Sequence, residues 1–299
     1  MATPSAEVDV DVPLVRSLLR DQHPDLAGLP LRVVANGWDN VVLRLGDDLA
    51  VRAPRRALAA RLVEHEQRWL PGIAARVAPV VPVPVPVRVG HPALGYPWSW
   101  SVVRWLPGEP VGARAAGVRV AEALAAFVEL LHVPAPGDAP ANPFRAVPLA
   151  ARSDAVLTRL TTADVPRARE LAAVWRTAAA LPTHAGPPVW VHGDLHPFNL
   201  LVDRSPDGDE RLSAVVDFGD VTAGDPAVDL ASAWLTLDRE ARHVFRDRVT
   251  APDTTWGRAR GWVVAMASAL ATADEPAFRS VARRSIDAVL DDDDPPGLS

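Results

Sequence analysis

Val-His-Gly-Asp-Leu-His-Pro-Phe-Asn-Leu-Leu-Val is the sequence of residues 191–202, and it places the acid Asp194 five residues before the amide Asn199. A second acid, Asp217, follows 18 residues after Asn199, at the end of an apolar run and directly before Phe-Gly-Asp. Phosphoryl transfer requires a carboxylate that accepts the proton of the attacking hydroxyl, and oxygen ligands that hold Mg²⁺ against the phosphates. The spacing of these three residues is that of a kinase catalytic loop and the metal-binding segment that follows it.

The two motifs resemble those of the aminoglycoside phosphotransferase and choline-kinase-like family, whose catalytic loop contains His-Gly-Asp and, five residues after the Asp, an Asn. The resemblance covers residues 33–237. It implies an α+β, protein-kinase-like bilobal fold, with a small N-terminal lobe formed by an antiparallel sheet and one helix, and a larger, mostly helical C-terminal lobe. It also implies the site residues: Asp194 as catalytic base, Asn199 and Asp217 as Mg²⁺ ligands, and His192, His196 and Asp229 as supports of the loop.

The segment Gly-Asp-Pro-Ala-Val-Asp-Leu-Ala at residues 224–231 is expected to open a helix, in which Asp229 caps free backbone donors. In the family an acid at this place buttresses the catalytic loop, and that role agrees with a cap. Asp220 and Asp225, in the same region, are open to contact with either substrate or solvent.

The first lobe is predicted from residues 31–105. Three apolar runs are separated by turn residues, and Gly-Asp-Asp at residues 46–48 is typical of a hairpin. A helical pattern follows and is expected to end at Pro71-Gly72. The alternation of proline and valine at residues 79–86 favours an extended chain without regular ladder bonds. The expected strands are residues 31–34, 40–45, 49–53, 87–89 and 100–105, the expected helix is 57–70, and the lobes are expected to be residues 1–105 and 106–299.

The second lobe is predicted to be mainly helical, because its longer segments are rich in Ala and Leu at helical spacing. Short apolar runs near the catalytic loop indicate brief strands. The expected helices are residues 121–131, 153–181 (as several segments), 229–236, 239–249, 259–270 and 276–290, and the expected strands are 189–192, 199–202 and 213–216.

The nucleotide site is assigned by the resemblance. Residues 36–40 lie between the first two expected strands, where a kinase has its phosphate-covering loop, and Arg52 stands on the third strand in the position of the usual phosphate-contacting lysine. A guanidinium is forked and bulkier than an ammonium, although a subgroup of the family shares this arginine. Residues 102–108 resemble the family's hinge between the lobes, where backbone groups hydrogen-bond the purine. The expected nucleotide-binding residues are Gly37, Trp38 and Asn40, Arg52 with its ion-pair partner Glu66 (Glu64 being the alternative), and the backbone of Arg104 and Leu106 in this hinge.

Composition excludes several other classes of protein. The chain of 299 residues has no cysteine, so disulfides and thiolate zinc sites are excluded. A net charge of −6 without a basic stripe predicts no nucleic-acid partner. The sequence lacks a long uncharged apolar run and a secretory leader, so we expect a cytoplasmic protein that does not bind membranes. Residues 217–299 contain fifteen acids and nine arginines, which favours a cationic acceptor.

The predicted function is transfer of the γ-phosphate of ATP or GTP to a hydroxyl of a small molecule, such as an aminoglycoside, a macrolide or a metabolite, by a monomer or weak homodimer. One alternative is a kinase of protein-linked groups, but the 13 residues of 217–229 are too few for a peptide-docking loop. Another is a nucleotide-binding pseudokinase or regulatory module without turnover, suggested by Arg52 and the single glycine of the phosphate-covering loop, and opposed by the intact catalytic residues.

Metal-dependent hydrolysis is a further alternative, because His192, Asp194 and His196 lie close together in the sequence. Two imidazoles four residues apart bind zinc from one face of a helix. Gly193 and Pro197 interrupt any helix here, so this alternative is disfavoured.

Overall fold

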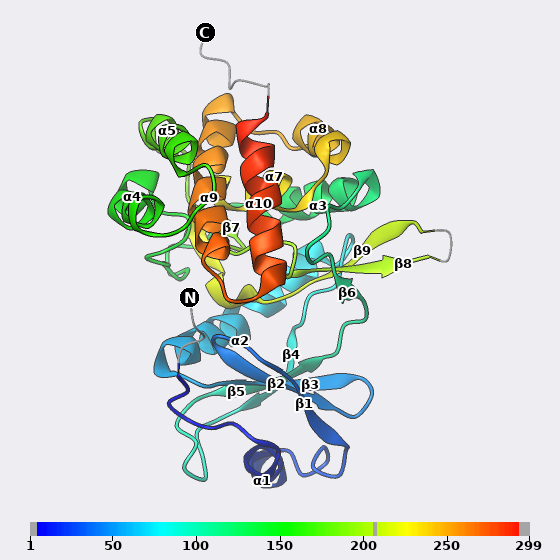
Figure 1. The fold of residues 1–299 in the computed structure, drawn as a ribbon. Coiled ribbons are helices and arrows are strands. Elements are labelled where there is room, and N and C mark those ends of the chain that lie inside the picture. Colours follow the sequence, from blue (N-terminus) through cyan, green and yellow to red (C-terminus); the bar gives the residue numbers. More distant parts are fainter. Residues whose placement is uncertain (1–4, 206–207, 293–299) are drawn as a thin grey trace.

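The protein is described by a computed structural model of residues 5–205 and 208–292, and its two lobes lie one below the other in Figure 1. The lower lobe contains a five-stranded sheet in the order β1-β2-β3-β5-β4, in which every neighbouring pair is antiparallel. Turn residues separate its first three strands, as the sequence predicts. The strands are β1 (Leu31–Asn36), β2 (Asn40–Leu45), β3 (Leu49–Pro54), β4 (Pro86–Gly90) and β5 (Trp100–Arg104).

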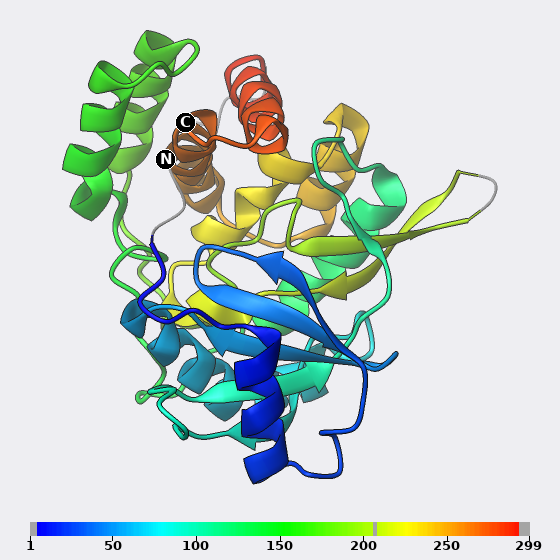
Figure 2. The ribbon, with the colours of Figure 1, turned by 60° about the horizontal axis from the view of Figure 1, so that its bottom comes forward.

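The first lobe contains two helices, α1 (Val12–Gln22) and α2 (Ala57–Val77), so the prediction of one helix is wrong. The side chain of Asp11 accepts the backbone N–H of Leu14, and a proline occupies the first turn, a combination that starts helices. The apolar side of α1 packs on the sheet, against which Figure 2 shows the helix in dark blue.

Helix α2 also runs further than predicted, because it continues through Pro71 to Val77. Proline inside a helix costs about 3 kcal/mol. Ile73 and Val77, beyond it, are buried in the core of the second lobe, and their burial offsets that cost. This helix therefore contributes to both lobes.

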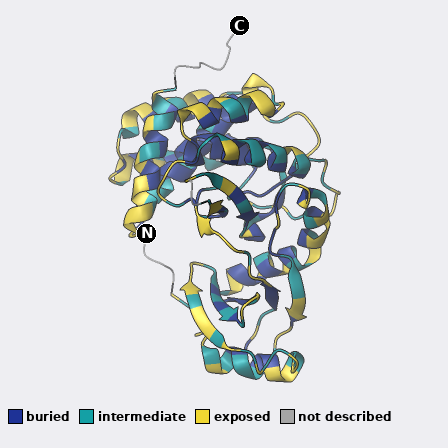
Figure 3. Cartoon of the chain, turned by 90° about the vertical axis from the view of Figure 1, so that its right-hand side faces the viewer, coloured by how far each residue is buried: buried dark blue, intermediate teal, exposed yellow. Residues whose placement is uncertain are grey.

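The second lobe consists of helices and two small sheets, β6-β8-β9 and β7-β10. Its long core helix α9 packs against α10 and α5, and buried residues, dark blue in Figure 3, line the inner faces of its helices. The elements are β6 (Glu109–Pro110), α3 (Val118–Leu131), the 3₁₀ helix η1 (Leu149–Arg152), α4 (Ser153–Thr162), α5 (Ala168–Ala179), β7 (Val189–Val191), β8 (Leu200–Arg204), β9 (Glu210–Val215), the 3₁₀ helix η2 (Phe218–Asp220), β10 (Thr222–Gly224), α6 (Ala227–Leu230), α7 (Ser232–Thr236), α8 (Arg239–Arg248), α9 (Asp253–Ala271) and α10 (Pro276–Leu290).

These elements confirm the predicted α+β architecture, with corrections in the second lobe: α9 begins at Asp253 and not at residue 259, β9 begins at Glu210 and not at residue 213, and the short strands β6 and β10 were not predicted. The helix expected over residues 229–236 is divided at Ala231, whose ψ of −23° belongs to a tighter turn than the α-helix. A division into residues 1–105 and 106–299 remains our proposal. None of the helices among the described residues combines the length and apolar character of a membrane span.

Candidate active site

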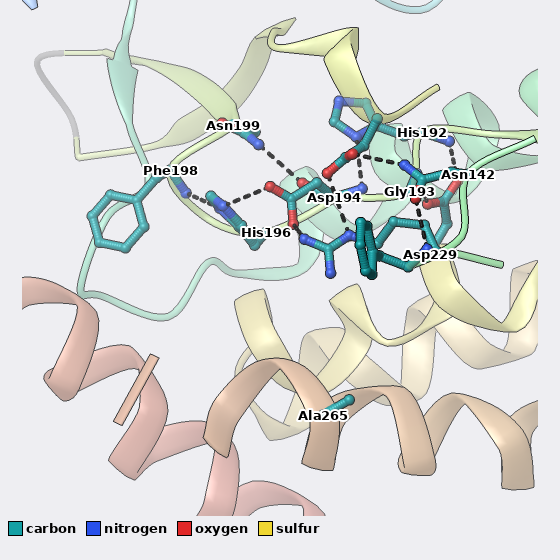
Figure 4. Close-up of polar contacts among 12 residues, drawn as sticks. Asn142, His192, Gly193, Asp194, His196, Phe198, Asn199, Asp229 and Ala265 are labelled. Atoms are coloured by element: carbon teal, nitrogen blue, oxygen red, sulfur yellow. Dashed lines mark hydrogen bonds and ion pairs between the residues drawn. The ribbon is translucent and has the colours of Figure 1, made fainter. Parts of the chain in front are cut away.

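The predicted catalytic loop, residues 192–199, follows β7 and is held by a buried carboxylate. Asp229, which is fully buried, accepts the backbone N–H of His192 at 2.7 Å and that of Gly193 at 2.8 Å (Figure 4). His132 Nε2 lies 3.1 Å from the same carboxylate. The predicted helix cap is wrong, because Asp229 lies within α6 and its donors come from the loop. Its predicted position behind the loop is observed.

His192 connects the loop to the segment before Asp217. Its Nδ1 accepts the N–H of Asp194 at 3.2 Å, so its Nε2 carries the proton and donates to the carbonyl of Val216 at 3.0 Å. The next residue, Gly193, has a φ of +84°, and a Cβ here would lie 2.6 Å from the carbonyl oxygen of Asp220. Only glycine fits this close approach without strain.

Asp194 lies between the guanidinium of Arg145 and the imidazole of His196. Arg145 Nη2 donates to its Oδ1 at 2.9 Å, and His196 Nε2 lies 3.3 Å from its Oδ2. Burial favours the neutral carboxyl, but the charges of His196 and Arg145 hold the pKa of Asp194 well below its ordinary value. For His196, burial lowers the pKa, but the Asp194 carboxylate raises it by more, so the pKa of His196 lies above its ordinary value. Asp194 is therefore ionised.

The sequence did not reveal Arg145, which lies in the loop before η1. Its Nε is also 3.3 Å from Asp220 Oδ2, and the amide of Asn142 donates to Asp220 Oδ1 at 2.8 Å. Burial raises the pKa of Asp220, and Arg145 opposes the shift. Of the two acids left open by the sequence, Asp220 lies in the site. Asp225 is instead buried in an ion pair with Arg258 at 2.6 Å.

Asn199 and Asp217, the predicted metal ligands, line the same cavity. The amide nitrogen of Asn199 donates to the carbonyl of Asp194 at 2.9 Å, so the atom available to a cation is Oδ1. The side chain of Asp217 is 55 % exposed and can be reached from the cavity. Within the described residues no group of three or more His, Cys, Asp or Glu could hold a metal alone. Two oxygen ligands suit Mg²⁺, which completes its coordination with phosphates and water.

Arg52 joins the two lobes by contacting acids on either side. Its Nη1 donates to Glu66 Oε1 at 2.9 Å, and its Nη2 donates to Asp217 Oδ1 at 2.8 Å. The ion pair predicted with Glu66 is therefore present, whereas Glu64 accepts from Ser99 at 3.4 Å. Burial raises the pKa of Glu66 to about 7, although Arg52 acts in the opposite direction. A forked guanidinium makes both contacts at once, which a lysine could not do in the same geometry.

A cavity of about 760 Å³ extends between the lobes and past Asp194. Asn40 lines it as well, and the Oδ1 atom of Asn40 is buried without a hydrogen-bond partner among the described atoms. Glu66 lies behind Arg52, and His192 and Asp229 lie behind the loop, so these three do not line the cavity. The predicted nucleotide residues that do line it are Gly37, Trp38, Asn40, Arg52, Arg104 and Leu106.

Two arginines that the sequence did not single out hold the loop of residues 36–40. Arg55 donates to the carbonyl of Gly37 at 3.0 Å, and Arg56 Nη2 lies 2.5 Å from Asp39 Oδ1. In the hinge, Trp105 donates its N–H to the carbonyl of Asp48 at 2.8 Å. The flanking residues Arg104 and Leu106 are the expected donors and acceptors for a base.

Comparisons with known proteins agree with this architecture. The sequence model described as "Phosphotransferase enzyme family" matches residues 30–262, more than half of the chain. No curated protein sequence is significantly similar. Among solved structures, the GDP complex of wild-type aminoglycoside 2'-phosphotransferase-IIIa is similar with a TM-score of 0.66 and 17 % identity, over 94 % of this chain and 99 % of that one.

Two further structures share the fold. The GDP and kanamycin complex of APH(2")-IIia has a TM-score of 0.65 and 18 % identity, over 93 % of this chain and 97 % of that one. The macrolide 2'-phosphotransferase MphH apoenzyme from Brachybacterium faecium has a TM-score of 0.56 and 21 % identity, over 95 % of this chain and 99 % of that one. At these identities the structures establish a common fold.

Proposed function

The chain belongs to the phosphotransferase enzyme family, and from this we propose that it transfers the γ-phosphate of ATP or GTP to a hydroxyl group of a small molecule. One observation carries the proposal: Asp194, Asn199 and Asp217 line a single cavity with Arg52 and the hinge. A nucleotide bound at the hinge would direct its phosphates towards Arg52 and the two proposed metal ligands. Asp194 lies further along the cavity, where an acceptor would meet the γ-phosphate.

In the proposed reaction, Asp194 orients the acceptor hydroxyl and takes its proton. Each carboxylate oxygen has a side-chain neighbour, Arg145 for Oδ1 and His196 for Oδ2, but each has a further lone pair that can accept a hydroxyl. A carboxylate of low pKa is a weak base, so proton transfer comes late, as the acceptor oxygen bonds to phosphorus. The bond between the γ-phosphorus and the bridging oxygen breaks, and the nucleoside diphosphate leaves with that oxygen.

Asn199 and Asp217 would hold Mg²⁺ through oxygen atoms, consistent with the donor set described above. When bound, the ion would neutralise charge on the phosphates. Arg52 would add a second cation near them, because its guanidinium contacts Asp217 at 2.8 Å. Since Glu66 fixes the other side of that guanidinium, its direction is set before any nucleotide binds.

The acceptor would occupy the part of the cavity formed by α4, α9 and α10, beyond Asp194. In Figure 4 the side chain of Ala265 on α9 faces the loop that carries Asp194. Solved relatives hold kanamycin, streptomycin or gentamicin, and others are macrolide phosphotransferases. For this chain, aminoglycosides, macrolides and small hydroxylated metabolites are the acceptor classes to test.

The proposal is tested by measuring release of nucleoside diphosphate from ATP and from GTP, with acceptors of each class present or absent. We expect release that requires Mg²⁺, stops with a chelator and rises with one acceptor class. The preferred nucleotide identifies the donor. If the purified protein binds neither nucleotide in the presence of Mg²⁺, the proposal is wrong.

A further inference from the structure

The acceptor end of the cavity has an apolar wall. Val156 comes from α4, Phe278 comes from α10, and several residues of α9 lie between them. Phe198, which directly precedes Asn199, packs edge to face on Phe278 at 4.4 Å between ring centroids. The apolar side chains that line this end are Phe144, Val156, Phe198, Trp262, Ala265, Met266, Ala269, Leu270, Ala273 and Phe278.

Arginines outnumber acids among the charged groups on this wall. Arg145, Arg152 and Arg159 line the cavity here, and the acids beside them are Asp194 and Asp220. Arg145 already pairs with both acids, so it neutralises charge that the wall would otherwise present. Of the fifteen acids in residues 217–299, the described ones that line the cavity are Asp217 and Asp220. The acidic balance that favoured a cationic acceptor therefore does not extend to this wall.

Among the described residues, neither Arg152 nor Arg159 forms an ion pair with a carboxylate. The guanidinium carbon of Arg152 lies 5.1 Å above the ring of Phe144. Arg159 Nη1 donates to the carbonyl of Ala265 at 3.1 Å and to Ser268 Oγ at 3.0 Å. Neither interaction supplies a negative charge. Two guanidinium groups thus border an apolar pocket without a carboxylate to balance them.

The three cations are close enough to repel one another. Burial lowers the pKa of Arg159, and the charges of Arg152 and Arg145 lower it further. Burial and the charge of Arg145 likewise lower the pKa of Arg152. Like charges gathered beside apolar surface are unfavourable until an anion balances them, and such an arrangement attracts anionic ligands.

We propose that the acceptor is an amphiphilic alcohol with an apolar body and an anionic group, which Arg152 and Arg159 bind while its hydroxyl meets Asp194. This inference rests on the proposed function, since it concerns the acceptor of that reaction. The anionic group is a carboxylate or a phosphate, both of which match the fork of a guanidinium. A polycation such as an aminoglycoside would place its ammonium groups against these arginines and is disfavoured.

The inference is tested by calorimetric titration of the full-length wild-type protein, saturated with Mg²⁺ and a non-hydrolysable ATP analogue. The probes share one ten-carbon chain and one hydroxyl: ω-hydroxydecanoate, ω-hydroxydecyl phosphate, decanediol and ω-aminodecanol. We expect one of the anions to bind at least about tenfold more tightly than the diol, in line with the strength of charge-assisted hydrogen bonds. We expect the ammonium compound to bind most weakly. The anion that binds more tightly shows whether the site prefers a carboxylate or a phosphate.

Substitutions of Arg152 test whether the apolar wall and its arginines cause the preference for anionic probes. Arg152→Gln should weaken the preferred anion about tenfold and leave the diol unchanged, whereas Arg152→Lys should retain much of the affinity. Arg169→Gln is the matched control, because Arg169 is exposed on α5 and does not line the cavity. If Arg152→Gln and Arg152→Lys lose equal anion affinity while their melting temperatures stay unchanged, the charge of residue 152 does not bind the anion and the inference is wrong.

The result also separates this inference from the proposed function. Binding of the ATP analogue is measured first, and a protein that fails to bind it would overturn the proposed phosphotransferase function. If the analogue binds normally but ω-aminodecanol binds as tightly as ω-hydroxydecanoate and the phosphate, only the anionic acceptor is wrong.

Discussion

Arg145 Nη2 donates to Asp194 Oδ1 at 2.9 Å, across 49 residues of sequence. The same guanidinium approaches Asp220 at 3.3 Å, so a single cation lies between two carboxylates at the proposed acceptor side of the site. Asp194 and Asp220 would otherwise repel each other, and Asp194 could turn away from the acceptor. Arg145 is therefore a positioning residue for the proposed base.

Replacement of Arg145 tests that role. Arg145→Gln keeps a hydrogen-bond donor but removes the charge, so kcat should fall about tenfold, which corresponds to one charge-assisted hydrogen bond. The KM for nucleotide should hardly change, because Arg145 contacts Asp194 and Asp220 and none of the residues proposed to bind the nucleotide. Arg145→Lys should restore part of kcat. An unchanged kcat, or a loss of equal size in both variants, would contradict a positioning role.

Asp217→Asn tests the proposed metal ligand. For the wild-type protein, Mg²⁺ should tighten the binding of a fluorescent ATP analogue, and the variant should lose most of that increase because an amide oxygen carries no charge. Turnover should be abolished in parallel. Asp203→Asn, at an exposed position on β8, is the control. An equal effect of Mg²⁺ on both variants would remove Asp217 from the metal site.

Both the charge and the forked shape of the Arg52 side chain are expected to matter, the first for stability and the second for nucleotide affinity. Arg52→Met would leave the buried Glu66 without its cation, and we expect the free energy of unfolding to fall by about 3 kcal/mol or more. Arg52→Lys keeps the charge but makes one contact in place of two, so nucleotide affinity should fall about tenfold with a smaller loss of stability. Urea unfolding and nucleotide titration measure the two effects. A lysine variant with wild-type affinity would show that the fork is dispensable.

Asp229 should matter chiefly for stability of the loop. Asp229→Ala leaves the buried N–H groups of His192 and Gly193 without an acceptor, which should lower the free energy of unfolding by about 3 kcal/mol. Asp229→Asn retains one acceptor oxygen and should cost less. Urea denaturation gives both values. If the alanine variant is as stable as the wild-type protein, the carboxylate does not hold the loop.

The sequence predicted the parts of the site that lie in compact motifs. Asp194, Asn199 and Asp217 follow fixed spacings, and alternating apolar and turn residues indicated the strands that carry Arg52. Arg145 escaped notice because its partner is 49 residues away and its own loop has no repeating pattern. Only the packing of that loop against the rest of the second lobe brings it to Asp194.

Two errors in the helices have local causes. The sequence does contain a signal for the start of α1, since Asp11 precedes a valine and a proline, but the helix has only 11 residues and so provides a short periodic pattern. Pro71 predicts an end of α2 at that point, because proline usually ends helices. The burial of Ile73 and Val77 against the other lobe overrides that local preference, and it depends on contacts that a single segment does not reveal.

The most direct test of the account compares the wild-type protein with Asp194→Asn, using nucleotide affinity and acceptor-stimulated release of nucleoside diphosphate as separate readouts. The account predicts nearly equal affinity for Mg²⁺-nucleotide and a fall in acceptor-dependent turnover of about 10² to 10⁴, the usual contribution of a positioned base. An Asp194→Asn protein that transfers phosphate at the wild-type rate would contradict the central claim.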